Sequence, residues 1–236
     1  MNKNSLALAA AVAAAALYTP SASAQYSTPA AKPEDLAAYY SGVIERRTTG
    51  IVTDLALADA AKSNRVHETI MSQYRSLKAR DEAIDAKLKE TAKQGGGKET
   101  DRAGLFQTMS KPLHEQFLSK LSADLTPEQV ETVKDKMTYG KVKFTFDGYC
   151  SIVPGLTDQD KAKIMEMLKA AREEAIDGGS AKEKSDIFQK YKDQINEYLN
   201  THGHDVAKAY RDWNAKQDLA KKQQEGATNK QTPAPQ

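Results

Sequence analysis

The sequence predicts an all-α fold, an antiparallel bundle of about six to eight helices with one extended aromatic connector. Three observations support this prediction. Apolar residues recur at helical spacing along most of the 236 residues. Strand-like alternation is confined to one short segment, residues 141–146. Finally, two sequences typical of helix starts occur at Thr126 and Ser180.

Two stripes of apolar residues predict the first two helices. The first stripe runs from Leu36 to Leu55 behind Pro33, a residue that suits a first helical turn, and predicts a helix over residues 34–56. The second stripe runs from Val66 to Leu88 and predicts a helix that starts near Asp59. The three consecutive glycines at residues 95–97 then form a loop or hinge, because glycine breaks helices.

Residues 105–121 also carry an apolar stripe, which Pro112 interrupts. Proline lacks a backbone donor and clashes with the preceding turn, so we expect a kink or a break there. Thr126 and Gln129 then form a capping box, in which each side chain satisfies a free backbone N–H. This box predicts a short helix that ends near Met137.

The later helices follow from similar signals. Leu156-Thr157 repeats the Leu125-Thr126 pattern and opens a helix over residues 158–176. Ser180 and Glu183 form a second capping box and open a helix that ends near Thr201, and a last helix covers residues 205–221. We therefore expect an exposed segment at 25–33, a single helical domain at 34–222 and a disordered tail at 223–236.

The segment from Tyr139 to Pro154 is the exception to helical spacing. One short alternation cannot make a sheet, so we expect an extended connector between helices. Four aromatic rings and a carboxylate within it form our candidate ligand-binding site: Tyr139, Phe144, Phe146, Asp147 and Tyr149. Rings can stack on the faces of sugars while polar neighbours bond the hydroxyls. The alternative is that the rings anchor the connector to the core.

Other candidate sites have simpler explanations. His202 and His204 flank a glycine and could chelate a metal, but the same glycine suits a helix end, so we predict no metal site and no cofactor. Asp147, Glu174 and Asp177 are possible glycosidase carboxylates, yet 32 acidic residues leave the pair undefined and the catalytic residues unknown. Motifs of serine hydrolases, phosphate-binding loops and dinucleotide-binding folds are absent from the sequence.

The N-terminal residues predict export. Lys3 precedes an apolar run from Leu6 to Leu17, and small residues follow up to Ala24, so we expect a signal peptide cleaved after Ala24. The run of about 12 residues is shorter than the roughly 20 that cross a bilayer, so stable membrane insertion is not expected. The product is then periplasmic or extracellular. There the single cysteine, Cys150, cannot form an intramolecular disulfide.

Charge argues against one class of partner. The chain has 34 basic and 32 acidic residues, and such a balance does not favour binding to nucleic acid.

Two families resemble parts of the chain. The Leu-Thr-x-x-Gln element at 125–129 is similar to a motif of small periplasmic stress chaperones of the Spy and CpxP type. A longer likeness over about residues 36–210 resembles the exported bacterial family catalogued as domain of unknown function 3826. It is carried by residues 133–140, 156–157, 171–184 and 187–199. That family has no established activity, and its members tend to occur in bacteria that degrade complex polysaccharides. The resemblance therefore implies a carbohydrate context.

The function we expect from the sequence is that of a non-catalytic binding or accessory protein whose partner is a glycan or another envelope polymer. One alternative is a chaperone-like protein of the periplasm. The other is a carbohydrate-active enzyme with an unrecognised carboxylate site.

Overall fold

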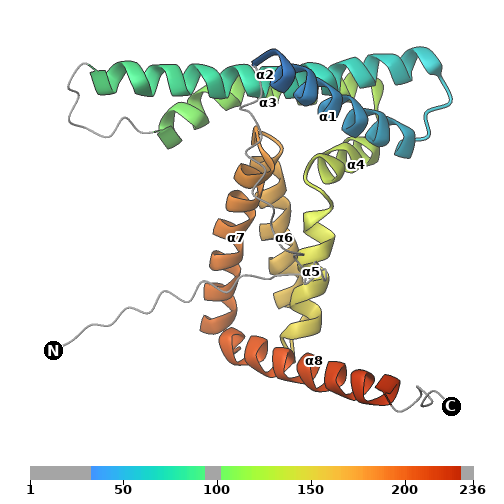
Figure 1. Ribbon diagram of the computed structural model, residues 1–236, viewed down its shortest axis with the longest axis vertical. Coiled ribbons are helices and arrows are strands. Elements are labelled where there is room, and N and C mark those ends of the chain that lie inside the picture. Colours follow the sequence, from blue (N-terminus) through green and yellow to red (C-terminus); the bar gives the residue numbers. More distant parts are fainter. Residues whose placement is uncertain (1–32, 94–101, 230–236) are drawn as a thin grey trace, which may run out of the picture. The chain divides into compact units, whose positions relative to one another are not determined.

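The computed structural model describes residues 33–93 and 102–229 (Figure 1). Within these ranges the fold is all-α, as predicted, and contains no strand. The helices are α1 (Pro33–Asp54), α2 (Ala60–Lys93), α3 (Arg102–Asp124), α4 (Pro127–Met137), α5 (Lys141–Ile152), α6 (Asp158–Ala175), α7 (Ala181–Thr201) and α8 (Val206–Asn229). No described helix is both long enough and apolar enough to cross a membrane. The predicted signal peptide and the glycine loop at 95–97 lie outside the described residues.

The predicted helix starts are confirmed at the level of single hydrogen bonds. The backbone N–H of Gln129 donates to Thr126 Oγ1 over 3.3 Å, and the N–H of Thr126 donates to Gln129 Oε1 over 3.0 Å. Thr157 and Ser180 form equivalent boxes at the starts of α6 and α7. Each box satisfies two backbone donors that a helix start leaves free, so these sequences define where the helices begin.

The predicted extended connector is wrong, because residues 141–152 form helix α5. Tyr139 and Gly140 both adopt left-handed backbone conformations, with φ angles of 62° and 64°, in the turn between α4 and α5. The side chains of Val142 and Tyr149 are both buried and lie seven residues apart, which is two helical turns. A lone segment has no partner strand, so helical hydrogen bonds satisfy its backbone instead.

Two other predictions were less accurate. Of the kink or break expected at Pro112, the break is absent, because α3 contains Pro112 and continues to Asp124. Helix α8 continues to Asn229, so the predicted helix end near Lys221 comes too early. Residues 230–236, the end of the predicted tail, lie outside the described residues.

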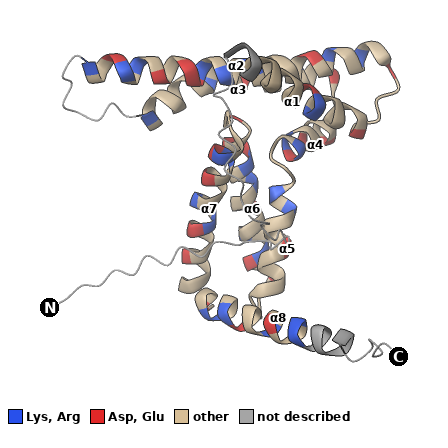
Figure 2. Ribbon diagram, in the orientation of Figure 1, with Lys and Arg blue, Asp and Glu red and all other residues tan. Residues whose placement is uncertain are grey.

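Contacts divide the chain after Tyr39, and residues from Tyr40 onward belong to one compact unit. This unit contains two separate hydrophobic cores. The N-terminal core is built by α1 to α4 together with Ile176, and the C-terminal core by α5 to α8. Helix α2 packs against α3 in the first group, and α6 packs against α5 and α7 in the second. Acidic and basic residues are interspersed along the helices, as Figure 2 shows.

The turn between α6 and α7 brings the two groups of helices together. Ile176 directly follows α6, yet its fully buried side chain belongs to the N-terminal core. Gly179 approaches α2 so closely that a Cβ atom there would lie 1.8 Å from Asp81 Oδ2. Glycine at position 179 therefore allows α2 to contact the turn.

The close approach at Gly179 predicts that Gly179→Ala lowers the free energy of unfolding by about 1 kcal/mol, because the new methyl group displaces only the Asp81 carboxylate, which pairs with Arg80. Urea denaturation followed by circular dichroism measures this change. Gly148→Ala is the matched control, since a Cβ at Gly148 in α5 meets nothing within 4 Å. There the better helix propensity of alanine should raise stability by about 0.5–1 kcal/mol. Equal effects at the two positions would contradict the proposed close packing.

Candidate functional site

Two of the predicted aromatic residues are on the surface. Tyr139 in the α4–α5 turn is 43% exposed, and Phe144 in the first turns of α5 is 61% exposed. The guanidinium carbon of Arg47, from α1, lies 5.1 Å from the centre of the Tyr139 ring. We call Tyr139 and Phe144 the aromatic platform.

The other two predicted rings belong to the protein interior. Tyr149 is 2% exposed, and its hydroxyl donates to Asn196 Oδ1 over 2.8 Å and lies 3.2 Å from the carbonyl of Lys192. This burial raises the pKa of Tyr149. Phe146 is half-buried and packs against the C-terminal core. For these two residues, the alternative that the rings anchor the segment to the core holds.

Asp147, the fifth predicted residue, lies on the surface of α5. Its Oδ2 atom is 2.6 Å from Lys143 Nζ, one helical turn earlier. Phe144 precedes Asp147 by three residues, and residues at this spacing are neighbours on a helix surface. An exposed ring and a neighbouring ion pair therefore share one face of the helix.

Three cations near the platform have no acidic partner. Arg47, Lys141 in α5 and Lys192 in α7 form no ion pair with any described residue. Lys141 Nζ lies 5.9 Å from the centre of the Phe188 ring, which places it beside α7. Burial is the main cause that lowers the pKa of Lys192, and the nearby positive charge of Lys141 lowers it further. The elements around the platform thus carry three cations without an ion pair, and Asp193 is the acid that acts on Lys192.

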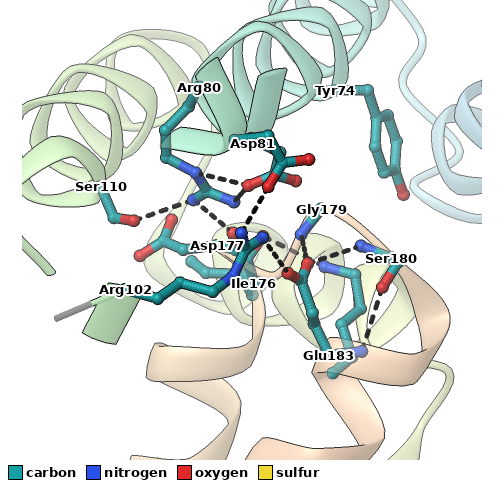
Figure 3. A network of polar contacts seen from close by, with 12 residues as sticks. Tyr74, Arg80, Asp81, Arg102, Ser110, Ile176, Asp177, Gly179, Ser180 and Glu183 are labelled. Carbon is teal, nitrogen blue, oxygen red and sulfur yellow. Dashed lines mark hydrogen bonds and ion pairs between the residues drawn. The ribbon is translucent and has the colours of Figure 1, made fainter. Parts of the chain in front are cut away.

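A second polar cluster lies at the α6–α7 turn and centres on Arg80 of α2 (Figure 3). Arg80 is 3% exposed. Its Nη1 atom donates to the carbonyl of Asp177 over 2.6 Å and to Ser110 Oγ over 2.8 Å. Its Nη2 atom donates to Asp81 Oδ1 over 2.6 Å, and its guanidinium carbon lies 4.3 Å from the centre of the Phe106 ring. Arg80 thereby joins α2, α3 and the turn after α6.

Lys184 completes this cluster from α7. It is 1% exposed, and Nζ donates to the carbonyls of Ala175 and Ile176 over 2.9 and 3.2 Å. A cation at the C-terminus of α6 also complements the helix dipole. Burial nevertheless lowers the pKa of Lys184 to about 8. Its donors therefore serve the end of α6, and we assign Lys184 a structural role.

Asp177 and His114 form the remaining pair of the cluster. Asp177 is 7% exposed, and its Oδ2 atom lies 3.0 Å from His114 Nδ1. The hydrogen bond with Asp177 raises the pKa of His114. Glu174, the other family-like carboxylate, instead pairs with Lys190 over 3.1 Å on the surface. Asp177 and Glu174 therefore have different partners, and the catalytic residues remain unassigned.

His202 and His204 do not converge on a common point. His202 Nδ1 lies 2.8 Å from the carbonyl of Tyr198, whereas His204 Nε2 lies 3.2 Å from Asp160 Oδ2. Gly203 between them has a φ of 90° and ends the helix, as its residue type indicates. In the described part of the chain, no three His, Cys, Asp or Glu residues are grouped so that they could hold a metal ion.

Sequence reasoning missed the buried cations, although their spacing carries a signal. Arg80 stands between Leu77 and Ile84 of one apolar stripe, and Lys184 stands one turn before Phe188 of another. Arg172 is likewise 3% exposed, and its Nη1 atom lies 2.6 Å from Asp135 Oδ1. A charged residue at a core position of a stripe could have indicated a buried ion pair.

Lys184 gives the protein a specific pH dependence. Between about pH 8 and the ordinary value of 10.5, the folded protein has released the Lys184 proton that the unfolded chain still holds. The contribution of Lys184 to stability therefore rises with pH in this window, by up to about 1.4 kcal/mol per unit. The Lys184→Met variant has no titrating amine at this position. The unfolding free energy of the native protein minus that of the variant should therefore rise with pH between about 8 and 10.5. Parallel pH profiles in urea denaturation would contradict the burial of a titrating amine.

Comparison with known proteins identifies the family. No curated protein shows significant similarity to this chain. A family model described as "Protein of unknown function (DUF3826)" matches residues 41–218, from α1 into α8, and so includes both cores and the aromatic platform. The chain therefore belongs to the DUF3826 family of proteins of unknown function.

Proposed function

We propose that this chain is an exported, non-catalytic binding protein that uses the aromatic platform, Tyr139 and Phe144, to bind a glycan. The observation that carries the proposal is the exposure of Phe144, which is 61% exposed, whereas Tyr149 on the same helix is 2% exposed. Leaving a phenylalanine ring in water forgoes about 1.5–3 kcal/mol of burial energy. A ligand that covers the ring would recover part of it.

The chemistry beside the platform suits a sugar. The C–H faces of pyranose rings are apolar and pack against aromatic rings, while their hydroxyls need hydrogen-bond partners. Lys143 and Asp147 lie on the same helix as Phe144 and are both exposed at its surface. Arg47 adds a further donor beside Tyr139. One helix and one turn thus present apolar and polar groups together.

Two inferences from the sequence support the cellular setting of this proposal. Residues 1–24 have the parts of a signal peptide, which would deliver the mature chain to the periplasm or the exterior. The resemblance of residues 36–210 to an exported family implies a carbohydrate context. Export would place the platform where polysaccharides are met.

The structure gives less support to the chaperone and enzyme alternatives. Thr126 and Gln129 of the Leu-Thr-x-x-Gln element form the cap of α4, and Leu125 is 7% exposed within the N-terminal core. Local structure therefore accounts for the residues on which the chaperone likeness is based. The buried groups Arg80 and Lys184 bond other protein groups, so they do not favour an enzyme either.

Binding to a panel of plant and host polysaccharides, measured by isothermal titration calorimetry, tests the proposal. Phe144→Ala and Tyr139→Ala should each weaken binding to any polymer that binds by about tenfold, because each removes a stacking surface worth about 1.4 kcal/mol. Leu219→Ala in α8 removes another exposed apolar side chain, 60% accessible, and should leave binding unchanged. Binding of no polymer, or equal affinity of Phe144→Ala and the native protein, would overturn the proposal.

A further inference from the structure

We infer that the ligand of the aromatic platform is a carboxylated polysaccharide, built from uronic acid units. This inference rests on the proposed function and adds the chemical class of the ligand. It is based on the charges around the platform.

Three cations near the platform form no ion pair with a described residue, although the charge of Asp193 acts on Lys192. Asp147 is the acid closest in sequence to Phe144, and Lys143 neutralises it over 2.6 Å. Arg47, Lys141 and Lys192 have no such partner among the described residues. Lys163 in α6, by contrast, pairs with Glu166 over 2.8 Å. The distinguishing feature of Arg47, Lys141 and Lys192 is that they come from the elements around the two exposed rings.

The three cations reach this region from different elements. Arg47 comes from α1 and lies above the ring of Tyr139. Lys141 is the first residue of α5 and lies beside Phe188 of α7. Lys192 lies one turn after Phe188 on α7, close enough to Lys141 for the charge of Lys141 to lower its pKa. The tertiary fold assembles the positive region, so it is not a run of lysines in the sequence.

Part of this arrangement is unfavourable for the free protein. The first turn of α5 contains Lys141 and Lys143 and no acidic residue, and no side chain caps its N-terminus at Gly140. Cations at a helix N-terminus oppose the helix dipole. An anionic ligand would relieve this repulsion, whereas a neutral glycan would not.

A uronic acid unit matches both features of the surface. Its pyranose ring offers a C–H face to Phe144 or Tyr139, and its carboxylate accepts hydrogen bonds from a guanidinium or an ammonium group. Arginine binds a planar carboxylate with two parallel hydrogen bonds, which favours carboxylate as the partner of Arg47. Repeated uronate units would allow Arg47, Lys141 and Lys192 to act together.

A pair of polymers that differ only in charge tests the inference. Polygalacturonate and its fully methyl-esterified form share the same sugar backbone, so their comparison isolates the carboxylate. The native protein should bind polygalacturonate at least about tenfold more tightly, and this preference should shrink as salt concentration rises. Equal affinity for the two polymers would overturn the inference and leave the proposed function standing. Failure to bind these polymers and every neutral polysaccharide would overturn both.

Variants then assign the preference to the residues. Arg47→Gln and the double substitution Lys141→Gln with Lys192→Gln should each reduce the preference for polygalacturonate at least about threefold, because each weakens binding of polygalacturonate more than binding of the esterified polymer. Lys163→Gln removes one paired positive charge from α6 and should preserve the preference. Thermal unfolding by circular dichroism shows whether each variant remains folded. Retention of the full preference by both folded variants, or equally tight binding of a single-stranded oligonucleotide, would overturn the inference.

Discussion

The guanidinium group of Arg80 links parts of the protein that have separate hydrophobic cores. It comes from α2, in the N-terminal group of helices, and donates to the carbonyl of Asp177 directly after α6. Replacing one partner of such a buried, hydrogen-bonded charge typically costs about 3–5 kcal/mol, because the other polar groups lose their partner. Gly179 allows the approach, and Ile176 adds an apolar anchor in the N-terminal core. Arg80 thus fixes how the α6–α7 turn meets α2 and α3.

The proposed binding surface depends on this junction. Arg47 belongs to the helices of the N-terminal core, whereas Phe144, Lys141 and Lys192 belong to those of the C-terminal core. Arg47 lies above Tyr139, which lies in the turn that follows α4 of the N-terminal core, so a fixed contact between the two groups determines how this pair lies relative to Phe144, Lys141 and Lys192. The buried cations are therefore structural, whereas Arg47 is exposed and Lys141 and Lys192 are half-buried, and we propose that these three contact a ligand.

Local chemistry in the sequence was sufficient to predict most of the fold. Thr126, Thr157 and Ser180 mark helix starts because capping depends only on residues within one turn. The failure at residues 141–152 has a different cause, since alternation of apolar and polar residues over six positions fits a strand and also a helix that is buried on one side. The positions of Phe144 and Tyr149 depend on this choice, as does the contact of Arg47 with Tyr139. The sequence alone could therefore indicate an aromatic site. It could not show which of its rings lie on the surface and which pack into the core.

The central claim, that Arg80 couples the two cores into one cooperative unit, is tested most directly by following urea unfolding with two probes. Fluorescence of Trp213, the only tryptophan in the chain, reports on the C-terminal core, and far-ultraviolet circular dichroism reports on all helices. In the native protein the two curves should superimpose, and in Arg80→Met they should separate. Separate curves in the native protein, or superimposed curves with an unchanged midpoint in Arg80→Met, would contradict the claim.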